Sequence, residues 1–404
     1  MSSRCRVRLT AMPTTPLADA LARHVGPDDV PGLVAVVGRG DDLDVTVLGD
    51  QTVGGPPMRE DSLHRIASIG KPITAAAALA LVADGVVALT DPVDDLLPEL
   101  AAPRVVRTLT SPLDDTVAAD RPITVEDLLR STNGHGFPSD FSAPAAVALM
   151  ERLLQGPPQP QRVAPPDEWM ATLGAIPLLH QPGDGFTYNA AFDILGVLIA
   201  RASGRSFPEY LTARILRPLG MDETRWWVDE PDLDRLATLY MRGPDGTLVP
   251  NTALGEEVTR PPLLHAGGGG LVSTVGDYHR FTQMLLRGGE LDGVRLLGPR
   301  TVAYMTRNHL PGGADMETMG RPIFAESSYR GVGFGLGFSV VDDAAAGKLV
   351  TSAGEYAWGG MASTAFYVDP VEEVTAMFFT QFLPSSTYPI RPRLRALVAQ
   401  ALVD

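Results

Sequence analysis

The stretch I-A-S-I-G-K-P-I-T-A-A-A, residues 66–77, opens the most apolar helix that the sequence predicts. Residues 70–84 are apolar on nearly every side, which is typical of a helix that is buried all round. The run ends at Gly85, a favoured residue just beyond a helix end. Pro72 falls at the first turn, where its missing N–H costs little. The sequence therefore predicts a fully buried helix that begins close to residue 70.

Ser68 and Lys71 stand three residues apart at the start of this helix. That spacing puts both side chains on one face, about 5–6 Å apart at Cβ. Only two of the 33 basic residues are lysines, and a buried lysine, unlike arginine, can lose its proton and act as a general base. A hydroxyl beside such an amine is an activated nucleophile, and free N–H groups of a first helical turn favour an oxyanion. The alternative is a lysine that extends to solvent from an amphipathic helix.

Two further segments are candidates for the same site. Tyr188 ends Q-P-G-D-G-F-T-Y (181–188), directly before a predicted helix, where its phenol is placed to share a proton with an amine and a serine. Trp358, Gly359 and Gly360 lead into a predicted strand, and paired glycines let another backbone approach closely. The alternatives are a packing tyrosine and a tight turn with a packing tryptophan.

Strand patterns occur at both ends of the chain, with helical patterns between them. The predicted strands are 33–39 and 43–49, which form a hairpin signal, and 337–341, 349–352, 363–368 and 374–382. The predicted helices are 17–24, 125–130, 145–154, 190–202, 208–219, 277–287 and 391–403, and a proline-rich surface loop is predicted at 155–167.

This order predicts an α/β domain that is split by a helical insertion. We expect residues 15–100 and 265–404 to form the α/β domain and residues 101–264 to form a mainly helical domain. Residues 1–14 are expected to be a flexible N-terminal segment.

Composition limits the classes of function. The net charge of −15 and the isoelectric point near 4.9 disfavour binding to nucleic acid. Cys5 is the only cysteine, and the seven histidines show no metal-ligand spacing, so neither a metal nor a cofactor is expected. Arg4, Arg6 and Arg8 are not followed by an apolar segment, so we expect no signal peptide, no membrane insertion and a cytoplasmic location.

Taken in order, these segments resemble the class C β-lactamase superfamily, including the family VIII esterases, over roughly residues 15–400. Further matching stretches are D-P-V-D-D-L-L-P-E-L (91–100), T-V-E-D-L-L-R-S-T-N-G (124–134), H-Q-P-G-D-G-F-T-Y-N (180–189), L-G-M-D-E-T (219–224) and G-G-G-G-L-V-S-T-V-G-D-Y (267–278). The resemblance implies a β-lactamase/transpeptidase-like fold: an antiparallel sheet flanked by helices, with an all-helical insertion domain.

The resemblance also implies roles for the candidate residues. Ser68 is then the acylated serine, Lys71 its base and Tyr188 the second proton-transfer group. The backbone N–H groups of Ser68 and Met361 would form the oxyanion hole. Residues 358–360 would occupy the substrate-binding strand motif that reads Lys-Thr-Gly in the β-lactamases.

Two departures from the family pattern bear on the substrate. Trp358 replaces the lysine of Lys-Thr-Gly, so the cation that would bind a β-lactam or peptide carboxylate is missing. The motif Tyr-x-Asn reads Tyr188-Asn189-Ala190, so the amide that contacts a substrate amide is expected to be lost. Losing a charge-assisted hydrogen bond costs about 1.5–3 kcal/mol. Both departures favour an esterase, and Trp-Gly-Gly is similar to the family VIII esterases and the lovastatin-type acyltransferase.

We therefore expect a serine hydrolase that cleaves small-molecule carboxylic esters. The alternatives are an acyltransferase to a small-molecule acceptor, a weak β-lactamase or D-alanyl-D-alanine peptidase, and a non-catalytic relic of the fold. Asn133 is a further candidate for substrate binding, and His135 in the same loop is another; a surface position is the alternative for both. A homo-oligomer is compatible with the sequence.

Overall fold

The computed structural model describes residues 14–26, 29–40, 42–138, 140–154, 162–252, 257–320, 328–388 and 390–401. Several sequence predictions fall wholly or partly outside these ranges. They concern Cys5, residues 1–13 of the expected flexible segment, residues 155–161 of the expected loop and residues 402–403 of the last predicted helix.

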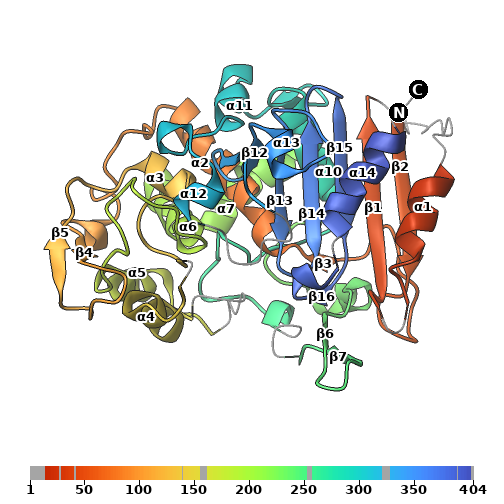
Figure 1. The fold of residues 1–404 in the computed structure, drawn as a ribbon, viewed down its shortest axis with the longest axis horizontal. Helices are drawn as coiled ribbons and strands as arrows, with labels where there is room; N and C mark the ends of the chain where they lie inside the picture. The colour runs from red at the N-terminus through yellow and green to blue at the C-terminus, as the bar shows by residue number, and fades with distance from the viewer. Residues whose placement is uncertain are drawn as a thin grey trace.

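A seven-stranded antiparallel sheet forms one side of the molecule (Figure 1). Its strands lie in the order β11-β12-β13-β14-β15-β1-β2. Their bounds are β1 Gly32–Arg39, β2 Asp42–Gly49, β11 Val332–Phe334, β12 Ser339–Val341, β13 Tyr356–Gly360, β14 Thr364–Asp369 and β15 Val374–Phe379. Val34 of β1 pairs with Phe379 of β15, so strands from opposite ends of the chain lie side by side in the sheet.

The two faces of the sheet pack against different helices. Val34 and Val36 point into the larger core, which includes Phe281 of α10 (Val275–Leu286). Leu33, Ala35 and Val37 point into a smaller cluster, formed with α1 (Thr14–Ala22) and α14 (Ile390–Ala401). The alternation of side chains along a strand thus divides the apolar residues between two layers.

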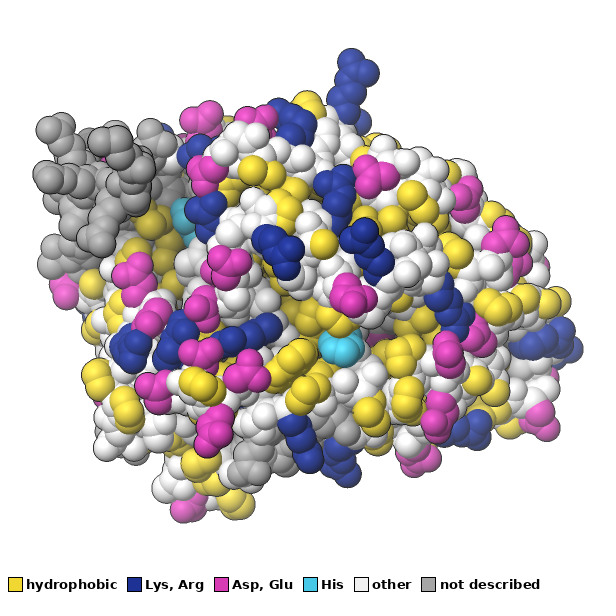
Figure 2. Space-filling view, turned by 180° about the vertical axis from the view of Figure 1, so that it is seen from behind, with side chains coloured by type: hydrophobic (Ala, Val, Ile, Leu, Met, Phe, Trp, Pro, Cys, Tyr) yellow, Lys and Arg dark blue, Asp and Glu magenta, His cyan; other side chains and the backbone are white. Residues whose placement is uncertain are grey.

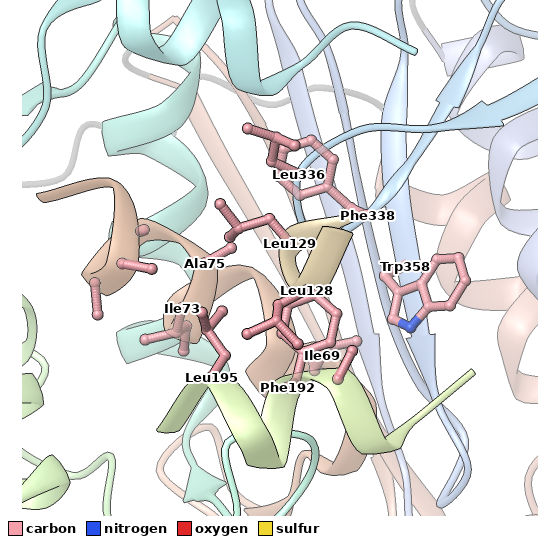
Figure 3. Packing of buried hydrophobic residues seen from close by; sticks show 14 of the residues in the cluster. Ile69, Ile73, Ala75, Leu128, Leu129, Phe192, Leu195, Leu336, Phe338 and Trp358 are labelled. Carbon is pink, nitrogen blue, oxygen red and sulfur yellow. The ribbon is translucent and has the colours of Figure 1, made fainter. Parts of the chain in front are cut away.

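The next helices along the chain after α2 (Gly70–Ala83) are α3 to α8, and of these α3 to α7 lie on the other side of the molecule (Figure 1). Their bounds are α3 Val125–Leu129, α4 Pro144–Leu153, α5 Pro166–Gly174, α6 Ala190–Ser203, α7 Phe207–Leu211 and α8 Arg217–Leu219. Ile73 of α2 meets Phe192 and Leu195 of α6 in the buried core, and Leu128 of α3 packs beside them (Figure 3). α2 is therefore enclosed, as its uniformly apolar sequence predicts.

Shorter elements complete the fold. They are β3 His64–Arg65, β4 Arg104–Val106, β5 Thr116–Ala118, β6 Tyr240–Arg242, β7 Leu248–Pro250, β8 Val272–Ser273, β9 Glu290–Leu291, β10 Val294–Arg295, β16 Phe382–Leu383, α11 Pro299–Met305, α12 Met316–Met319 and α13 Ala344–Gly347. None of the helices in the described part of the chain is both long and apolar enough to cross a bilayer. Figure 2 shows acidic and basic side chains interspersed over one face of the molecule.

The observed elements confirm most predicted ones and correct others. Residues 358–360, expected to lead into a strand, belong to β13 themselves, and the strand predicted at 374–382 ends at Phe379. The hairpin of β1 and β2 and the helices α2, α3, α4 and α6 begin and end within two residues of the predicted bounds. The strand predicted at 349–352 is wrong, because these residues form an irregular, bent segment after α13. Lys348, with φ of 55°, turns the chain there, and Val350 is 61% exposed.

Candidate active site

Ser68 lies in a single 3-10 turn, Ala67–Ile69, that runs directly into α2. Its side chain is partly exposed, whereas Lys71, in the first turn of α2, has no exposed area. The Nζ of Lys71 donates a hydrogen bond of 3.0 Å to the Oγ of Ser68. Ala67 adopts a left-handed φ of 47°, so the chain is strained beside the serine. The structure brings together the two residues that their spacing put on one face.

The amine of Lys71 is held by two more acceptors. Nζ donates to the Oδ1 of Asn189 at 3.2 Å and also to the backbone carbonyl of Gly268. Burial lowers the pKa of Lys71 to about 7, and the charge of Asp193 opposes this shift. Near neutral pH a substantial share of the Lys71 side chains is therefore neutral and able to accept a proton.

The four-glycine run lets the backbone reach this lysine. A Cβ atom at Gly267 would lie 2.3 Å from the carbonyl oxygen of Phe192 in α6, so only glycine fits there. Thr74 donates to the carbonyl of Gly267 at 2.8 Å. The N–H of Gly268 donates to the Oδ1 of Asp193 at 2.8 Å. Helices α2 and α6 thus fix the carbonyl that accepts from Lys71.

Tyr188 lies beside both residues. Its ring centroid is 4.6 Å from the Nζ of Lys71, and its hydroxyl accepts a 3.0 Å hydrogen bond from the indole Nε1 of Trp358. Burial raises the pKa of Tyr188 to about 12, although hydrogen bonds with Ser68 and Trp358 work against the shift. The phenol therefore stays protonated across the neutral range and is available as a proton donor to a departing group.

Strand β13 brings Trp358, Gly359 and Gly360 close to Ser68. A Cβ atom at Gly360 would lie 2.5 Å from the carbonyl oxygen of Ile66, so the strand packs directly against the turn that carries Ser68. Met361 follows β13 and is partly exposed. A small apolar pocket lies at this junction, lined by Arg65, Ala67, Leu239, Val258, Gly269, Gly270, Leu271, Met361, Ala362 and Leu383.

Asn133 and His135 do not lie at the surface, so that alternative is wrong. Their exposed fractions are 0% and 1%. The Nε2 of His135 bonds to the carbonyl of Ile176 at 2.9 Å. Among the described residues, neither amide atom of Asn133 has a hydrogen-bond partner. Because Asn133 is wholly enclosed, the structure offers no exposed atom of it to a substrate; substrate contact stays a prediction.

Asn189 is a site residue whose role the motif comparison missed. The amide expected to be lost from the third position of Tyr-x-Asn is present at the second position, where it contacts Lys71. Asn189 has φ of 92° and ψ of −65°, a conformation that few residues other than glycine adopt. That backbone turns its side chain toward the amine, and only the three-dimensional structure reveals it.

A metal site is not seen in the described ranges, where no group of three His, Cys, Asp or Glu side chains could hold an ion. The groups able to do chemistry here are a serine hydroxyl, a buried amine and a phenol. Together they can accept a proton from the nucleophile and return it to a leaving group.

Comparisons with known proteins assign the class. The chain shares its fold with solved structures: unliganded simvastatin synthase (LovD) from Aspergillus terreus superposes with a TM-score of 0.79 at 24% identity, covering 97% of this chain and 98% of that one. EstCE1, described as a hydrolase with promiscuous acyltransferase activity, superposes with a TM-score of 0.76 at 21% identity, covering 98% and 100%. The Beta-lactamase family model matches residues 17–400, and the chain belongs to this family.

Three relatives are similar over most of their length. Protein Rv1367c of Mycobacterium tuberculosis is 36% identical over 347 residues, which cover 85% of this chain and 83% of that protein. Esterase EstB of Burkholderia gladioli is 31% identical over 370 residues, covering 86% and 85%. Monacolin J acid methylbutanoyltransferase of Aspergillus terreus is 29% identical over 364 residues, covering 84% and 81%. The family thus includes both esterases and acyltransferases.

Proposed function

We propose that this protein is a carboxylesterase that forms an acyl-enzyme on Ser68. The observation that carries the proposal is the fully buried amine of Lys71, 3.0 Å from the Oγ of Ser68, with its pKa lowered to about 7. A neutral amine at this distance can take the hydroxyl proton as the oxygen attacks an ester carbonyl. The similarity to Esterase EstB supports an ester substrate.

The proposed reaction proceeds in two halves. As the Oγ of Ser68 bonds to the carbonyl carbon, its proton passes to Lys71, and the oxyanion is held by the N–H groups of Ser68 and Met361. The intermediate collapses, the ester C–O bond breaks, and Tyr188 gives its proton to the leaving alcohol while Lys71 restores the phenol. Water then attacks the acyl-enzyme by the same proton transfers in reverse. Each oxyanion donor contributes about 2.7–4 kcal/mol in other enzymes.

The acyl group is proposed to enter the apolar pocket lined by Ala67, Leu271 and Met361. Ala67 directly precedes Ser68 in the chain, and Met361 carries the second proposed oxyanion donor. The leaving alcohol then lies on the opposite side, toward Tyr188 and Trp358.

The test is hydrolysis of a panel of p-nitrophenyl esters beside nitrocefin, with Ser68→Ala as the control. We expect wild-type ester turnover, little nitrocefin turnover and no acylation of the variant. A fluorophosphonate probe should label Ser68, as located by peptide mass spectrometry. Undiminished ester turnover by Ser68→Ala would refute the assignment.

An acyltransferase is the second candidate, supported by the similarity to monacolin J acid methylbutanoyltransferase. The chemistry differs only in that an acceptor alcohol replaces water. Adding increasing acceptor alcohol at fixed ester and measuring the ratio of transferred to free acid separates the two. A product mixture dominated by the transfer product at millimolar acceptor would favour the transferase.

A further inference from the structure

A buried carboxylate lies behind the lysine of the site. Asp193, in the first turn of α6, is 7% exposed. Its Oδ1 accepts a 2.8 Å hydrogen bond from the N–H of Gly268, and the carbonyl of the same glycine accepts from the Nζ of Lys71. A Cβ atom at Gly268 would lie 2.9 Å from that Oδ1, so glycine lets the carboxylate approach closely. The two backbone groups of Gly268 thus connect the carboxylate to the amine.

The surroundings of Lys71 disfavour a positive charge. Its side chain has no exposed area, and it lies in the first turn of α2, where the helix dipole is unfavourable to a cation. The proposed reaction nevertheless makes an ammonium, because the amine takes the proton of Ser68. The charge of Asp193 raises the pKa of Lys71 against the larger effect of burial. The carboxylate therefore favours the charged form of Lys71 that the reaction has to produce.

The other groups that face Lys71 are neutral or act elsewhere. The amide of Asn189 and the carbonyl of Gly268 are neutral acceptors. Tyr188, with its pKa raised to about 12, is uncharged at neutral pH, and the cation of Arg391 on α14 acts on that phenol. Among the described residues, the negative charge that raises the pKa of Lys71 is that of Asp193.

We propose that Asp193 is a positioning residue that acts through Lys71: it holds Gly268 against the amine and stabilises the ammonium that forms when Ser68 gives up its proton. This inference rests on the proposed esterase function. The proton passes from the Oγ of Ser68 to the Nζ of Lys71, and Asp193 takes none. The buried aspartate of a Ser-His-Asp triad supports its histidine in the same way.

Asp193→Asn separates the charge from the hydrogen bond, because the amide oxygen can still accept from the N–H of Gly268. Lys71 then loses its proton more easily, so the midpoint of kcat/KM against pH for the neutral ester p-nitrophenyl acetate should fall by roughly half a unit or more. The plateau above the midpoint should fall by roughly threefold or more, because a weaker base takes the Ser68 proton more slowly. The midpoint is the deciding readout, since a purely structural role would not move it.

Asp369→Asn is the matched control. It removes the same charge from a carboxylate that is 4% exposed and that also accepts from backbone N–H groups, those of Val371 and Glu372. Asp369 ends β14, whereas Thr364, which donates to the carbonyl of Ile66 beside the nucleophile, begins it. The length of the strand thus separates the control charge from the site, and Asp369→Asn should leave the midpoint unchanged.

The outcomes separate this inference from the function it rests on. An unchanged midpoint in Asp193→Asn, with Ser68 still labelled by the fluorophosphonate probe, overturns the role of Asp193 and leaves the esterase standing, whatever happens to the plateau. Absence of ester turnover and of Ser68 labelling in the wild type overturns both proposals. If Asp193→Asn does not fold, Asp193→Ser, a smaller neutral acceptor, takes its place: a lower midpoint supports the role and a wild-type midpoint overturns it.

Discussion

Lys71 is the residue on which the proposed chemistry depends, and its environment makes its titration observable. Burial lowers its pKa to about 7, while the pKa of Tyr188 is raised to about 12. We therefore expect kcat/KM for a neutral ester to rise with pH through a midpoint near 7 and then stay level to about pH 10, because the amine is deprotonated and the phenol is still protonated. A profile that is flat from pH 5 to 9 would contradict the role of Lys71 as base.

The same burial should make Lys71 costly for stability. Its pKa is about 7 in the folded protein and 10.5 for a solvated lysine of the unfolded chain, so below pH 7 both states are charged and the full cost of burying the ammonium applies. Between pH 7 and 10.5 the unfolded state holds more protons, and the cost fades as pH rises.

Lys71→Met should therefore abolish turnover and yet raise the free energy of unfolding by a few kcal/mol at pH 6, with the gain shrinking toward pH 10. Urea unfolding at several pH values measures this. Lys348→Met is the matched control, because it removes the other lysine from an exposed turn and should change stability little at any pH. If Lys71→Met raised the free energy of unfolding equally at pH 6 and pH 10, the gain would not come from removing a buried ammonium group.

At the scale of elements, the local sequence pattern predicts a helix or hairpin correctly where the structure depends mainly on residues within that segment. The apolar run of 70–84 predicted α2, and alternating strands around Gly40 predicted the first hairpin. The strand predicted at 349–352 is wrong: these residues pair with none of the strands in the described part of the chain, and Val350 is 61% exposed. Strand propensity reflects packing on a sheet, which a single segment does not contain.

The same distinction holds for the candidate site: contacts within one segment are predictable from the sequence, and contacts between distant segments are not. The spacing of Ser68 and Lys71 specifies their contact, because both lie on one turn. The contact of Asn189 with Lys71 depends on a backbone conformation at a helix start. Asp193 gave no signal among the acidic residues, since its contact with Gly268 joins segments that only the folded chain brings together.

The contact of β13 with the nucleophile turn makes Gly360 a sensitive position. In Gly360→Ala the new Cβ would lie 2.5 Å from the carbonyl of Ile66 and 2.2 Å from the Oγ1 of Thr364, so strand and turn must separate. We expect a loss of about 1–3 kcal/mol of stability, as for other overpacked sites, and a fall in kcat of at least tenfold because the proposed oxyanion donors on the two segments move apart.

Gly276→Ala is the control for this substitution. Gly276 lies exposed in α10, where a Cβ meets only the Oγ1 of Thr274 at 3.9 Å. Alanine there should be neutral or stabilising by up to about 1 kcal/mol. If the Gly360→Ala variant had the same kcat as the wild type, the contact of β13 with the turn that carries Ser68 would not be needed to position the proposed oxyanion donors.

At the scale of the whole molecule, α14 links the sheet to the active site. Leu394 and Val398 fill the cluster that α14 shares with α1 and the outer face of the sheet. Arg391 and Arg395 lie one turn apart on the same helix; the first reaches the catalytic strand and the second reaches Glu355, directly before that strand. The helix is thus anchored by apolar packing and by a buried ion pair, and its position sets that of Arg391.

Arg395→Met should test this anchor. Side-chain exposure in the pair is 14% for Arg395 and 0% for Glu355, so removing the arginine leaves a carboxylate buried without its cation. Breaking one side of a buried pair costs about 3–5 kcal/mol, and urea and thermal unfolding should both show it. Arg59→Met breaks the pair with Asp61, whose side chains are 46% and 52% exposed, and should cost less than about 1 kcal/mol.

A double variant separates the buried charge from the loss of packing. If the uncompensated carboxylate is the cause, Glu355→Gln combined with Arg395→Met should recover much of the stability lost in Arg395→Met. An Arg395→Met protein as stable as the wild type would show that α14 is held by its apolar face alone.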